Sequence, residues 1–233
     1  MPDNLDRPIV VANFAITWDG KISTVSHTPS TFSSPLDKRR LSEIRAQGDA
    51  VLVGAGTLRA DNMKMVLNRT ELRQARLARG QSGVPMRVIV SNRGSVDPSL
   101  KVFQHPVAPV HLFTTEAMPL DARAALNGHA KIHVDSTPEV DLPAMLKCLH
   151  SELGVRRLIC EGGATLFASM LSLNFIDELY LTWCPILFGS AQAPTITGLP
   201  GAAPLFPASR SMQLKSWETN SHGEAFLHYI FDN

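Results

Sequence analysis

Two glycines that follow an apolar run give this sequence its clearest chemical signal. Residues 157–160 are typical of a buried strand, and Glu161, Gly162 and Gly163 follow them before a segment compatible with a helix. Glycines let an anion approach the backbone closely, and a helix N-terminus offers unpaired N–H groups and the positive end of its dipole. The pattern predicts a phosphate site at residues 162–166. The same spacing also occurs in a tight turn that binds no ligand.

Two further segments offer groups that could bind phosphate. Residues 54–59 follow an apolar run and imitate the first part of the pattern G-x-G-x-x-G, but Arg59 stands where the third glycine belongs. Ser91 and Arg93 lie just past another apolar run, and their hydroxyl and guanidinium donors would suit the 2′-phosphate of NADP. The alternative for residues 91–93 is a polar turn with a structural role only.

Residues that often bind metals do not form a convincing site. His222 and Glu224 match one half of a zinc deaminase signature, but no P-C-x-x-C segment follows them. Cys148, Cys160 and Cys184 are widely spaced in apolar surroundings and include no C-x-x-C pair, which indicates free thiols in a reducing compartment. We therefore expect no bound metal.

The composition limits the classes of protein that this chain can belong to. It has 233 residues, of which 44% are hydrophobic and 18% are charged, so we expect one domain over residues 1–233 with a sizeable core. A net charge of +1 argues against a nucleic-acid partner, and Arg69, Arg73 and Arg76 are expected on one solvated helix face. Because no signal core and no membrane-spanning run are present, we expect a cytoplasmic protein without a membrane partner.

The order of the elements predicts the fold class. Strands are expected at residues 9–16, 50–53, 87–90, 110–113, 131–134, 157–160, 178–184, 212–218 and 225–231. Helices are expected at residues 36–47, 69–79, 120–126, 142–153 and 164–173, with a short helical turn at 54–61. Helices alternate with strands through residue 173, and strands then follow strands. This order predicts an α/β fold, with a mostly parallel sheet, helices on both faces and an antiparallel C-terminal ribbon.

Several segments, taken in order, resemble one family over roughly residues 8–231. They are Thr17–Lys21, Ile44–Ala46, Val53–Asp61, Arg87–Ser91, Glu161–Leu166 and Pro185–Gly189, the last followed by Ala193 and Pro194. The chain resembles the reductase domain of the bifunctional riboflavin-biosynthesis deaminase/reductases and the related stand-alone pyrimidine reductases. The resemblance implies a three-layer αβα fold like that of dihydrofolate reductase. We expect a single reductase domain without the family's deaminase domain.

The resemblance also implies an activity. Enzymes of this family transfer a hydride from NADPH to the ribose C1′ of 5-amino-6-(5-phosphoribosylamino)uracil, which opens the sugar into a ribityl chain. The cofactor does most of this chemistry, and the family has no well-defined catalytic acid. Asp61 is the one residue that we expect to be catalytic, because its position in the family pattern is near the reacting ribose. Family members are commonly homodimers, and a second copy pairing through the apolar C-terminal ribbon is the expected protein partner.

Site residues follow from the resemblance by position. Residues expected to border NADPH are Ala15, Thr31, Thr57, Asp61, Ser91, Arg93, Gly162, Gly163, Ala164, Thr165 and Leu166. Arg45 is expected at the substrate phosphate and Glu161 at the pyrimidine ring. Met65 is a further expected substrate contact.

The segment after Asp61 departs from the family pattern. The family continues as Asp-Asp-Pro-x-Leu-x-x-Arg, whereas here Asn62, Met63 and Met65 stand at the positions of the second acid, the proline and the leucine. The arginine is either lost at Asn68 or displaced to Arg69, and Pro29 stands where a substrate-contacting serine is expected. Two alternatives therefore stay open. One is an NADPH reductase of the same fold for another pyrimidine or pterin-like compound, and the other is a non-catalytic dinucleotide-binding protein.

Overall fold

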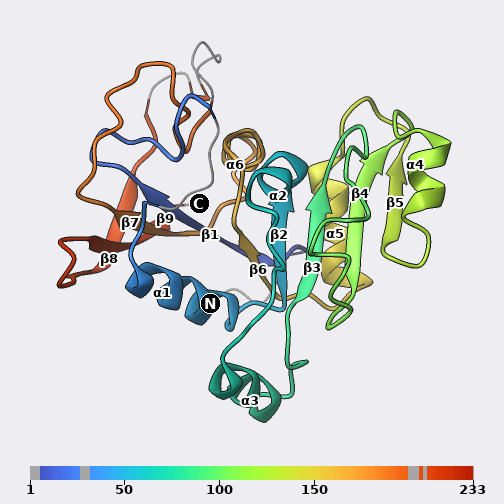
Figure 1. Ribbon diagram of the computed structural model, residues 1–233, viewed down its shortest axis with the longest axis horizontal. Coiled ribbons are helices and arrows are strands. Elements are labelled where there is room, and N and C mark those ends of the chain that lie inside the picture. Colours follow the sequence, from blue (N-terminus) through green and yellow to red (C-terminus); the bar gives the residue numbers. More distant parts are fainter. Residues whose placement is uncertain (1–5, 27–31, 199–204, 207–208, 233) are drawn as a thin grey trace. The chain divides into compact units, whose positions relative to one another are not determined.

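The computed structural model describes residues 6–26, 32–198, 205–206 and 209–232, and the chain divides into two compact units (Figure 1). Unit 1 comprises Met1–Ile9 and Ser42–Ile159, and unit 2 comprises Val10–Leu41 and Cys160–Asn233. The chain passes from one unit to the other within β1 (Ile9–Ile16), α1 (Pro35–Arg45) and β6 (Arg157–Cys160). The expectation of one domain stays a prediction.

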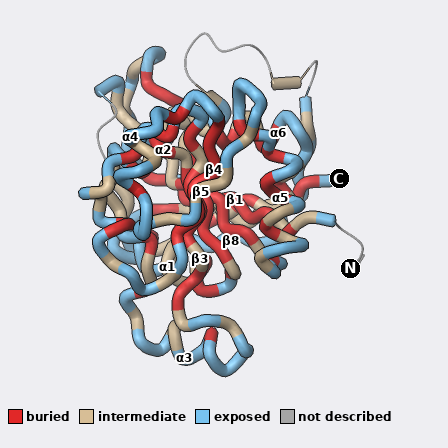
Figure 2. The backbone as a smooth tube through the Cα atoms, turned by 90° about the vertical axis from the view of Figure 1, so that its right-hand side faces the viewer, coloured by how far each residue is buried: buried red, intermediate tan, exposed pale blue. Residues whose placement is uncertain are grey.

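Unit 1 is built on a parallel sheet. Its strands lie in the order β5 (Lys131–Asp135), β4 (Val110–Thr115), β3 (Met86–Val90), β2 (Ala50–Gly54) and β6, and the pairs β2–β3, β3–β4 and β4–β5 are parallel. Every residue of β4 is buried, as expected for a central strand that is covered on both faces. Figure 2 shows the same burial along β3 and β4.

The helices of unit 1 cover both faces of its strands. They are α2 (Ala55–Asp61), α3 (Thr70–Ala78), α4 (Leu120–Ala125) and α5 (Leu142–Ser151). Figures 1 and 2 together show α5 on one side of the strands and α2 and α4 on the other, with α3 set apart below them. Asp141 accepts a hydrogen bond from the amide of Ala144 and so caps α5.

Unit 2 combines one parallel pair with an antiparallel ribbon. Strand β1 pairs in parallel with β7 (Glu178–Trp183), β7 pairs antiparallel with β9 (Ala225–Phe231), and β9 pairs antiparallel with β8 (Met212–Thr219). Helix α6 (Ala164–Ser172) packs on β1, where the rings of Phe14 and Phe167 meet edge to face with centroids 4.9 Å apart. Helix α1 packs on β9, with the Arg40 guanidinium 4.5 Å from the centre of the Phe226 ring.

The predicted elements are confirmed with shifts of a few residues at their ends. Strands β1, β6 and β9 have the predicted bounds, whereas α1 ends at Arg45 and α5 at Ser151, each two residues early. Helix ends fray, so such differences are expected. The mostly parallel sheet with helices and an antiparallel C-terminal ribbon is confirmed. No helix in the described ranges is long and apolar enough to cross a membrane.

The prediction for the arginines near α3 is wrong at Arg76. This side chain is only 1% exposed and donates hydrogen bonds to the carbonyls of Ala46, Gly48 and Ser82. Its burial lowers the pKa of the guanidinium, which nevertheless stays charged because its ordinary pKa is so high. Arg76 therefore ties α3 to the turn after α1 instead of facing solvent.

Candidate functional site

The turn between β6 and α6, where the sequence predicts a phosphate site, is built from two glycines. Gly162 and Gly163 have φ values of +80° and +94°, in the region that favours glycine. Gly163 is the N-cap of α6 and contributes no side-chain cap. Because the first N–H groups of a helix have no intrahelical partner, the amides of residues 164–166 are left for another acceptor. An anionic oxygen suits them, since the helix dipole is positive at this end.

The carboxyl end of β1 carries the next predicted cofactor residue. Ala15 is the second-last residue of this strand, is half-buried and pairs with Thr182 of β7. Ligands of α/β proteins bind at the carboxyl ends of parallel strands. Within unit 2, Ala15 thus has the position expected of a residue at a ligand site.

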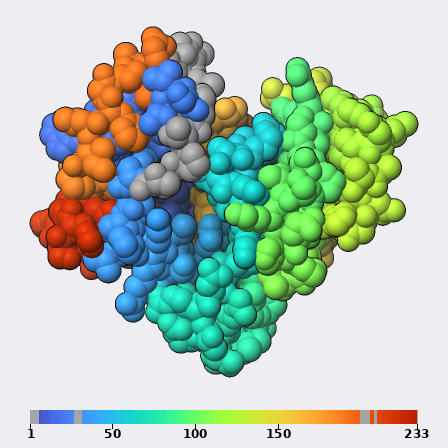
Figure 3. Space-filling model, in the orientation of Figure 1, coloured from blue at the N-terminus to red at the C-terminus, as the bar shows by residue number. Residues whose placement is uncertain are grey.

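Asp19, which the sequence indicated only as part of a turn, joins two of the family segments. It accepts a hydrogen bond of 2.6 Å from the Thr17 hydroxyl, and the amides of Phe188 and Gly189 donate to it at 3.2 and 2.8 Å. The Thr17 hydroxyl in particular lowers the pKa of Asp19 to about 2. Asp19 therefore fixes the loop after β1 against residues 185–189. The Trp18 amide also donates to the Ile186 carbonyl at 2.7 Å, and blue and orange parts of the chain adjoin on the face shown in Figure 3.

In unit 1, two predicted cofactor residues follow neighbouring parallel strands. Gly54, the last residue of β2, pairs with Val90, the last residue of β3. Thr57 follows in α2, and Ser91 comes directly after β3, so both lie at the carboxyl edge of these strands. The Ser91 hydroxyl accepts from the Ser95 amide at 3.1 Å and keeps its own proton to donate.

The turn that follows β3 exposes a positive charge. Arg93 is exposed, whereas Ser91 is buried. The turn is closed by a hydrogen bond of 3.0 Å from the Gly94 amide to the Ser91 carbonyl. It therefore has a structural role of its own, and it also presents one hydroxyl and one guanidinium on the same short segment.

The altered segment after Asp61 begins at the end of α2. Asp61 is half-buried and is the last residue of the helix, and Asn62 follows in the left-handed region with φ +42°. The Asn62 side chain accepts a hydrogen bond from the Lys101 amide at 2.9 Å. Met65 is 1% exposed with φ +52°, which leaves almost none of its side chain to a substrate. Its assignment as a substrate contact stays a prediction from the resemblance.

Arg45 meets this altered segment within unit 1. Its guanidinium lies 3.9 Å from the sulfur of Met63. Arg69 pairs with Glu43 of α1 at 2.8 Å and with Glu71 at 2.6 Å, and these two carboxylates raise the pKa of its guanidinium. Arg69, the possible displaced counterpart of the family arginine, is thus engaged in ion pairs. Arg45 remains the residue that we assign to the substrate phosphate.

The structure thus places the predicted residues in two groups, one in each unit. Unit 1 holds Arg45, Thr57, Asp61, Met65, Ser91 and Arg93, and unit 2 holds Ala15, Glu161 and Gly162–Leu166. Glu161 is half-buried and is the first residue after β6. Thr31 and Pro29 lie outside the described residues. In the described part of the chain, no group of three or more His, Cys, Asp or Glu side chains could hold a metal ion.

Comparison with known proteins shows that most of the chain matches one family. Residues 8–225 match the family model described as the RibD C-terminal domain. A 2,5-diamino-6-ribosylamino-4(3H)-pyrimidinone 5′-phosphate reductase from Archaeoglobus fulgidus is 34% identical over 190 residues, which cover 82% of this chain and 86% of the relative. The reductase of the same name from Methanothermobacter thermautotrophicus is 34% identical over 209 residues, or 90% of this chain and 92% of the relative.

Solved structures show the same fold. A pyrimidine reductase-like protein from Corynebacterium diphtheriae has a TM-score of 0.85 at 20% identity, over 97% of this chain and 92% of that chain. The riboflavin biosynthesis reductase Rib7 from Saccharomyces has a TM-score of 0.69 at 19% identity, over 100% and 93% of the two chains. The match over residues 8–225 and the two relatives at 34% identity show the family. The chain belongs to the RibD C-terminal domain family, an oxidoreductase family whose relatives are pyrimidine reductases.

Proposed function

We propose that this protein transfers a hydride from NADPH to the ribose C1′ of a ribosylaminopyrimidine 5′-phosphate. The hydride adds to C1′, the bond from C1′ to the ring oxygen breaks, and that oxygen gains a proton, so the sugar becomes a ribityl chain. NADPH leaves as NADP⁺. The cofactor supplies the reducing equivalent, and the protein binds and orients the two reactants.

The observation that carries this proposal is the N-terminus of α6. Gly163 provides no side-chain cap there, so the amides of residues 164–166 point out of the helix start without a partner from the N-cap. A dinucleotide pyrophosphate supplies the negative oxygens that such a terminus favours. Ala15 and Thr57, at the carboxyl ends of their strands, would border the rest of the cofactor.

The 2′-phosphate of NADPH would be held by Ser91 and Arg93. Ser91 can donate its hydroxyl proton, and the exposed guanidinium of Arg93 can form charge-assisted hydrogen bonds with phosphate oxygens. NADH lacks this phosphate. The pair therefore supports NADPH as the preferred nicotinamide cofactor.

The substrate we favour is 2,5-diamino-6-ribosylamino-4(3H)-pyrimidinone 5′-phosphate. The two relatives at 34% identity are named for it, whereas the RibD protein of Bacillus amyloliquefaciens is 26% identical, with this chain spanning 48% of its length. The deaminated compound, 5-amino-6-(5-phosphoribosylamino)uracil, is the second candidate. Arg45 would bind the phosphate and Glu161 the pyrimidine ring, with Asp61 near the ribose.

Steady-state turnover with matched substrates tests the proposal. NADPH oxidation would be followed with the diamino-pyrimidinone, with the deaminated uracil compound, and with each after removal of its phosphate. We expect turnover of both phosphorylated compounds and the higher kcat/KM for the diamino-pyrimidinone. Tight NADPH binding without turnover of either compound would instead favour the non-catalytic dinucleotide-binding alternative.

We also propose that the protein is a homodimer, formed through the C-terminal ribbon. Trp217 of β8 is 65% exposed, Leu214 beside it is exposed, and Trp183 of β7 contacts the exposed Trp18 with ring centroids 5.8 Å apart. Exposed apolar patches of this kind mark interaction surfaces, and β8 is also a sheet edge within unit 2. Trp217→Glu should shift the sedimentation coefficient from that of a dimer to that of a monomer. An unchanged coefficient would argue against this surface.

The cytoplasm is the location we propose for this enzyme. All three cysteines are free thiols, and Cys160 and Cys184 are buried. Unpaired thiols are typical of proteins in a reducing compartment. Fractionation of cells that produce the protein would test this location.

A further inference from the structure

The first turn of α1 is held by a carboxylate from the other end of the chain. Glu224 precedes β9, and its side chain is only 2% exposed. It accepts hydrogen bonds from the Ser34 amide at 2.7 Å and from the Ser34 hydroxyl at 2.5 Å. The Ser34 hydroxyl oxygen in turn accepts hydrogen bonds from the amides of Leu36 and Asp37 at 3.1 and 3.3 Å. Ser34 therefore caps the helix, and Glu224 fixes the cap.

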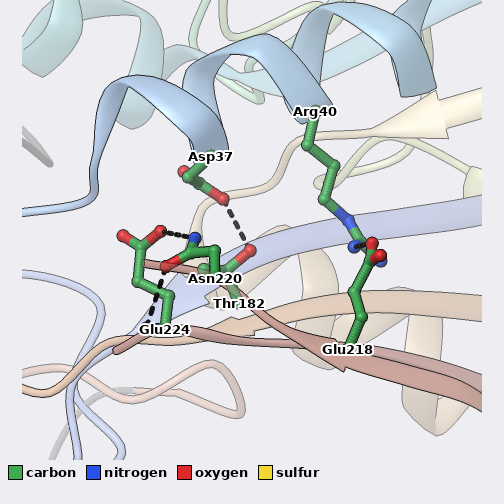
Figure 4. A network of polar contacts seen from close by, with 6 residues as sticks. All are labelled: Asp37, Arg40, Thr182, Glu218, Asn220 and Glu224. Atoms are coloured by element: carbon green, nitrogen blue, oxygen red, sulfur yellow. Dashed lines mark hydrogen bonds and ion pairs between the residues drawn. The ribbon is translucent and has the colours of Figure 1, made fainter. Parts of the chain in front are cut away.

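The surroundings of Glu224 favour the charged form of its carboxylate. The Asn220 side chain donates to it at 2.7 Å, as Figure 4 shows, and the Cys184 thiol lies 3.7 Å away as a further donor. Burial acts to raise the pKa of Glu224, but the donors, Ser34 first, outweigh it and hold the pKa below its ordinary value. Burial raises the pKa of Cys184 to about 12, so this thiol keeps the proton that it donates.

Two more contacts hold the same side of α1. The Thr182 hydroxyl donates to Asp37 at 2.5 Å, and Arg40 pairs with Glu218 at 2.9 Å (Figure 4). Ser34, Asp37 and Arg40 follow one another at intervals of three, so each is a neighbour of the next at the start of α1. The Glu218 side chain is 71% exposed, which makes its ion pair weak. Glu224 is the buried anchor, and Glu218 offers a matched control on the same hairpin.

The helix that Glu224 holds carries a residue of the candidate substrate site. Ser34 is the last residue before Pro35, the first residue of α1. Beyond Ser34, α1 runs without a break to Arg45. The segment His222-Gly223-Glu224, which the sequence showed to be no zinc motif, thus supplies a structural anchor.

We propose that Glu224 is a positioning residue of the reductase. Through Ser34 it fixes the first turn of α1, the helix that ends in Arg45. Glu224 itself touches neither reactant in this proposal. Its kinetic consequence rests on the proposed function, whereas its effect on the first turn of α1 does not.

The test uses two substitutions at the anchor and two controls. Glu224→Gln keeps the shape but removes the charge, and Ser34→Ala removes the hydroxyl, so each should raise KM for the phosphorylated substrate by about ten-fold with a smaller change in kcat. Ser34→Thr keeps a capping hydroxyl and should restore KM. Glu218→Gln should leave KM within about two-fold, since exposed ion pairs contribute little. Because the two side chains act through one contact, the double variant Ser34→Ala/Glu224→Gln should have a KM no higher than that of Glu224→Gln alone.

Amide hydrogen exchange in the absence of substrate separates this inference from the proposed function. Glu224→Gln should speed exchange at Ser34, Leu36 and Asp37, because their acceptors are weakened. Unchanged exchange at these amides, or wild-type KM and kcat in a folded Glu224→Gln variant, would overturn the inference. If Glu224→Gln does not fold, the comparison of Ser34→Ala with Ser34→Thr decides, and equal KM values would overturn it. A wild-type protein without turnover would contradict only the proposed function, and exchange would still decide the anchor.

Discussion

Gly162 lies directly over the ring of Phe14. A Cβ atom at Gly162 would stand 2.5 Å from Cζ of Phe14, and its φ of +80° already favours glycine. Phe14 packs in turn on Phe167 of α6. The two neighbouring glycines therefore differ: Gly162 lets the chain cross Phe14, whereas Gly163 is the N-cap of α6, where we propose that the cofactor pyrophosphate binds.

Gly162→Ala should destabilise the protein by about 2 kcal/mol or more. The added methyl group would overlap the Phe14 ring and would adopt a positive φ, and both effects oppose folding. Urea denaturation would measure the change in free energy of unfolding. Gly56→Ala is the matched control, since a Cβ there meets nothing within 4 Å. A loss of the same size in both variants would contradict the assigned contact.

Gly163→Val should weaken NADPH binding by about ten-fold or more while the fold persists. A branched side chain at the N-cap, with φ +94°, would crowd the space in front of the α6 amides and shift them. Fluorescence titration would give the dissociation constant, and circular dichroism would confirm folding. Normal NADPH affinity in the folded variant would place the pyrophosphate elsewhere.

The protein should bind NADPH about ten- to a hundred-fold more tightly than NADH. Charge-assisted hydrogen bonds to the 2′-phosphate contribute about 1.5–3 kcal/mol, and Ser91 and Arg93 are the groups that would make them. Arg93→Ala should remove most of this preference. NADH affinity serves as the control, because it should not change. Equal affinity of the wild-type protein for both cofactors would rule out this phosphate site.

Stability should fall as the pH drops from about 6.5 to about 4. His111 is buried with its Nδ1 3.0 Å from Nε2 of His133, and burial in particular lowers its pKa from 6.5 to about 4. Between these values the unfolded chain binds a proton that the folded protein excludes. The contribution of His111 to stability is therefore complete above pH 6.5 and decreases by about 3 kcal/mol toward pH 4.

Two histidine variants check the source of this pH dependence. His111→Phe removes the titrating group and should flatten the decrease in the free energy of unfolding over this pH range. His222→Gln, at an exposed position, should leave the decrease in place. A decrease that survives in His111→Phe would assign it to other groups.

The helices and strands were predictable because apolar runs and glycines mark them locally in the sequence. Several key side-chain contacts were not predictable, because they join residues far apart in the sequence. Apolar runs gave the bounds of β1 and β6, and the glycine pair gave the start of α6. Spacing placed Arg76 on a helix face but could not show that the carbonyls of residues 46 and 48 surround it. Glu224 was equally hidden, because its partner Ser34 is 190 positions away in the sequence.

Arg45→Ala should raise KM for the phosphorylated substrate by about ten- to a hundred-fold, the loss expected when charge-assisted hydrogen bonds to a phosphate are removed. The dephosphorylated substrate should show no such change. Arg69→Ala is the matched control, because the ion pairs of Arg69 with Glu43 and Glu71 already occupy its guanidinium. A larger effect from Arg69→Ala would mean that the displaced family arginine binds the phosphate. Equal turnover of both substrates by the wild-type protein would mean that the altered segment after Asp61 no longer builds a phosphate pocket.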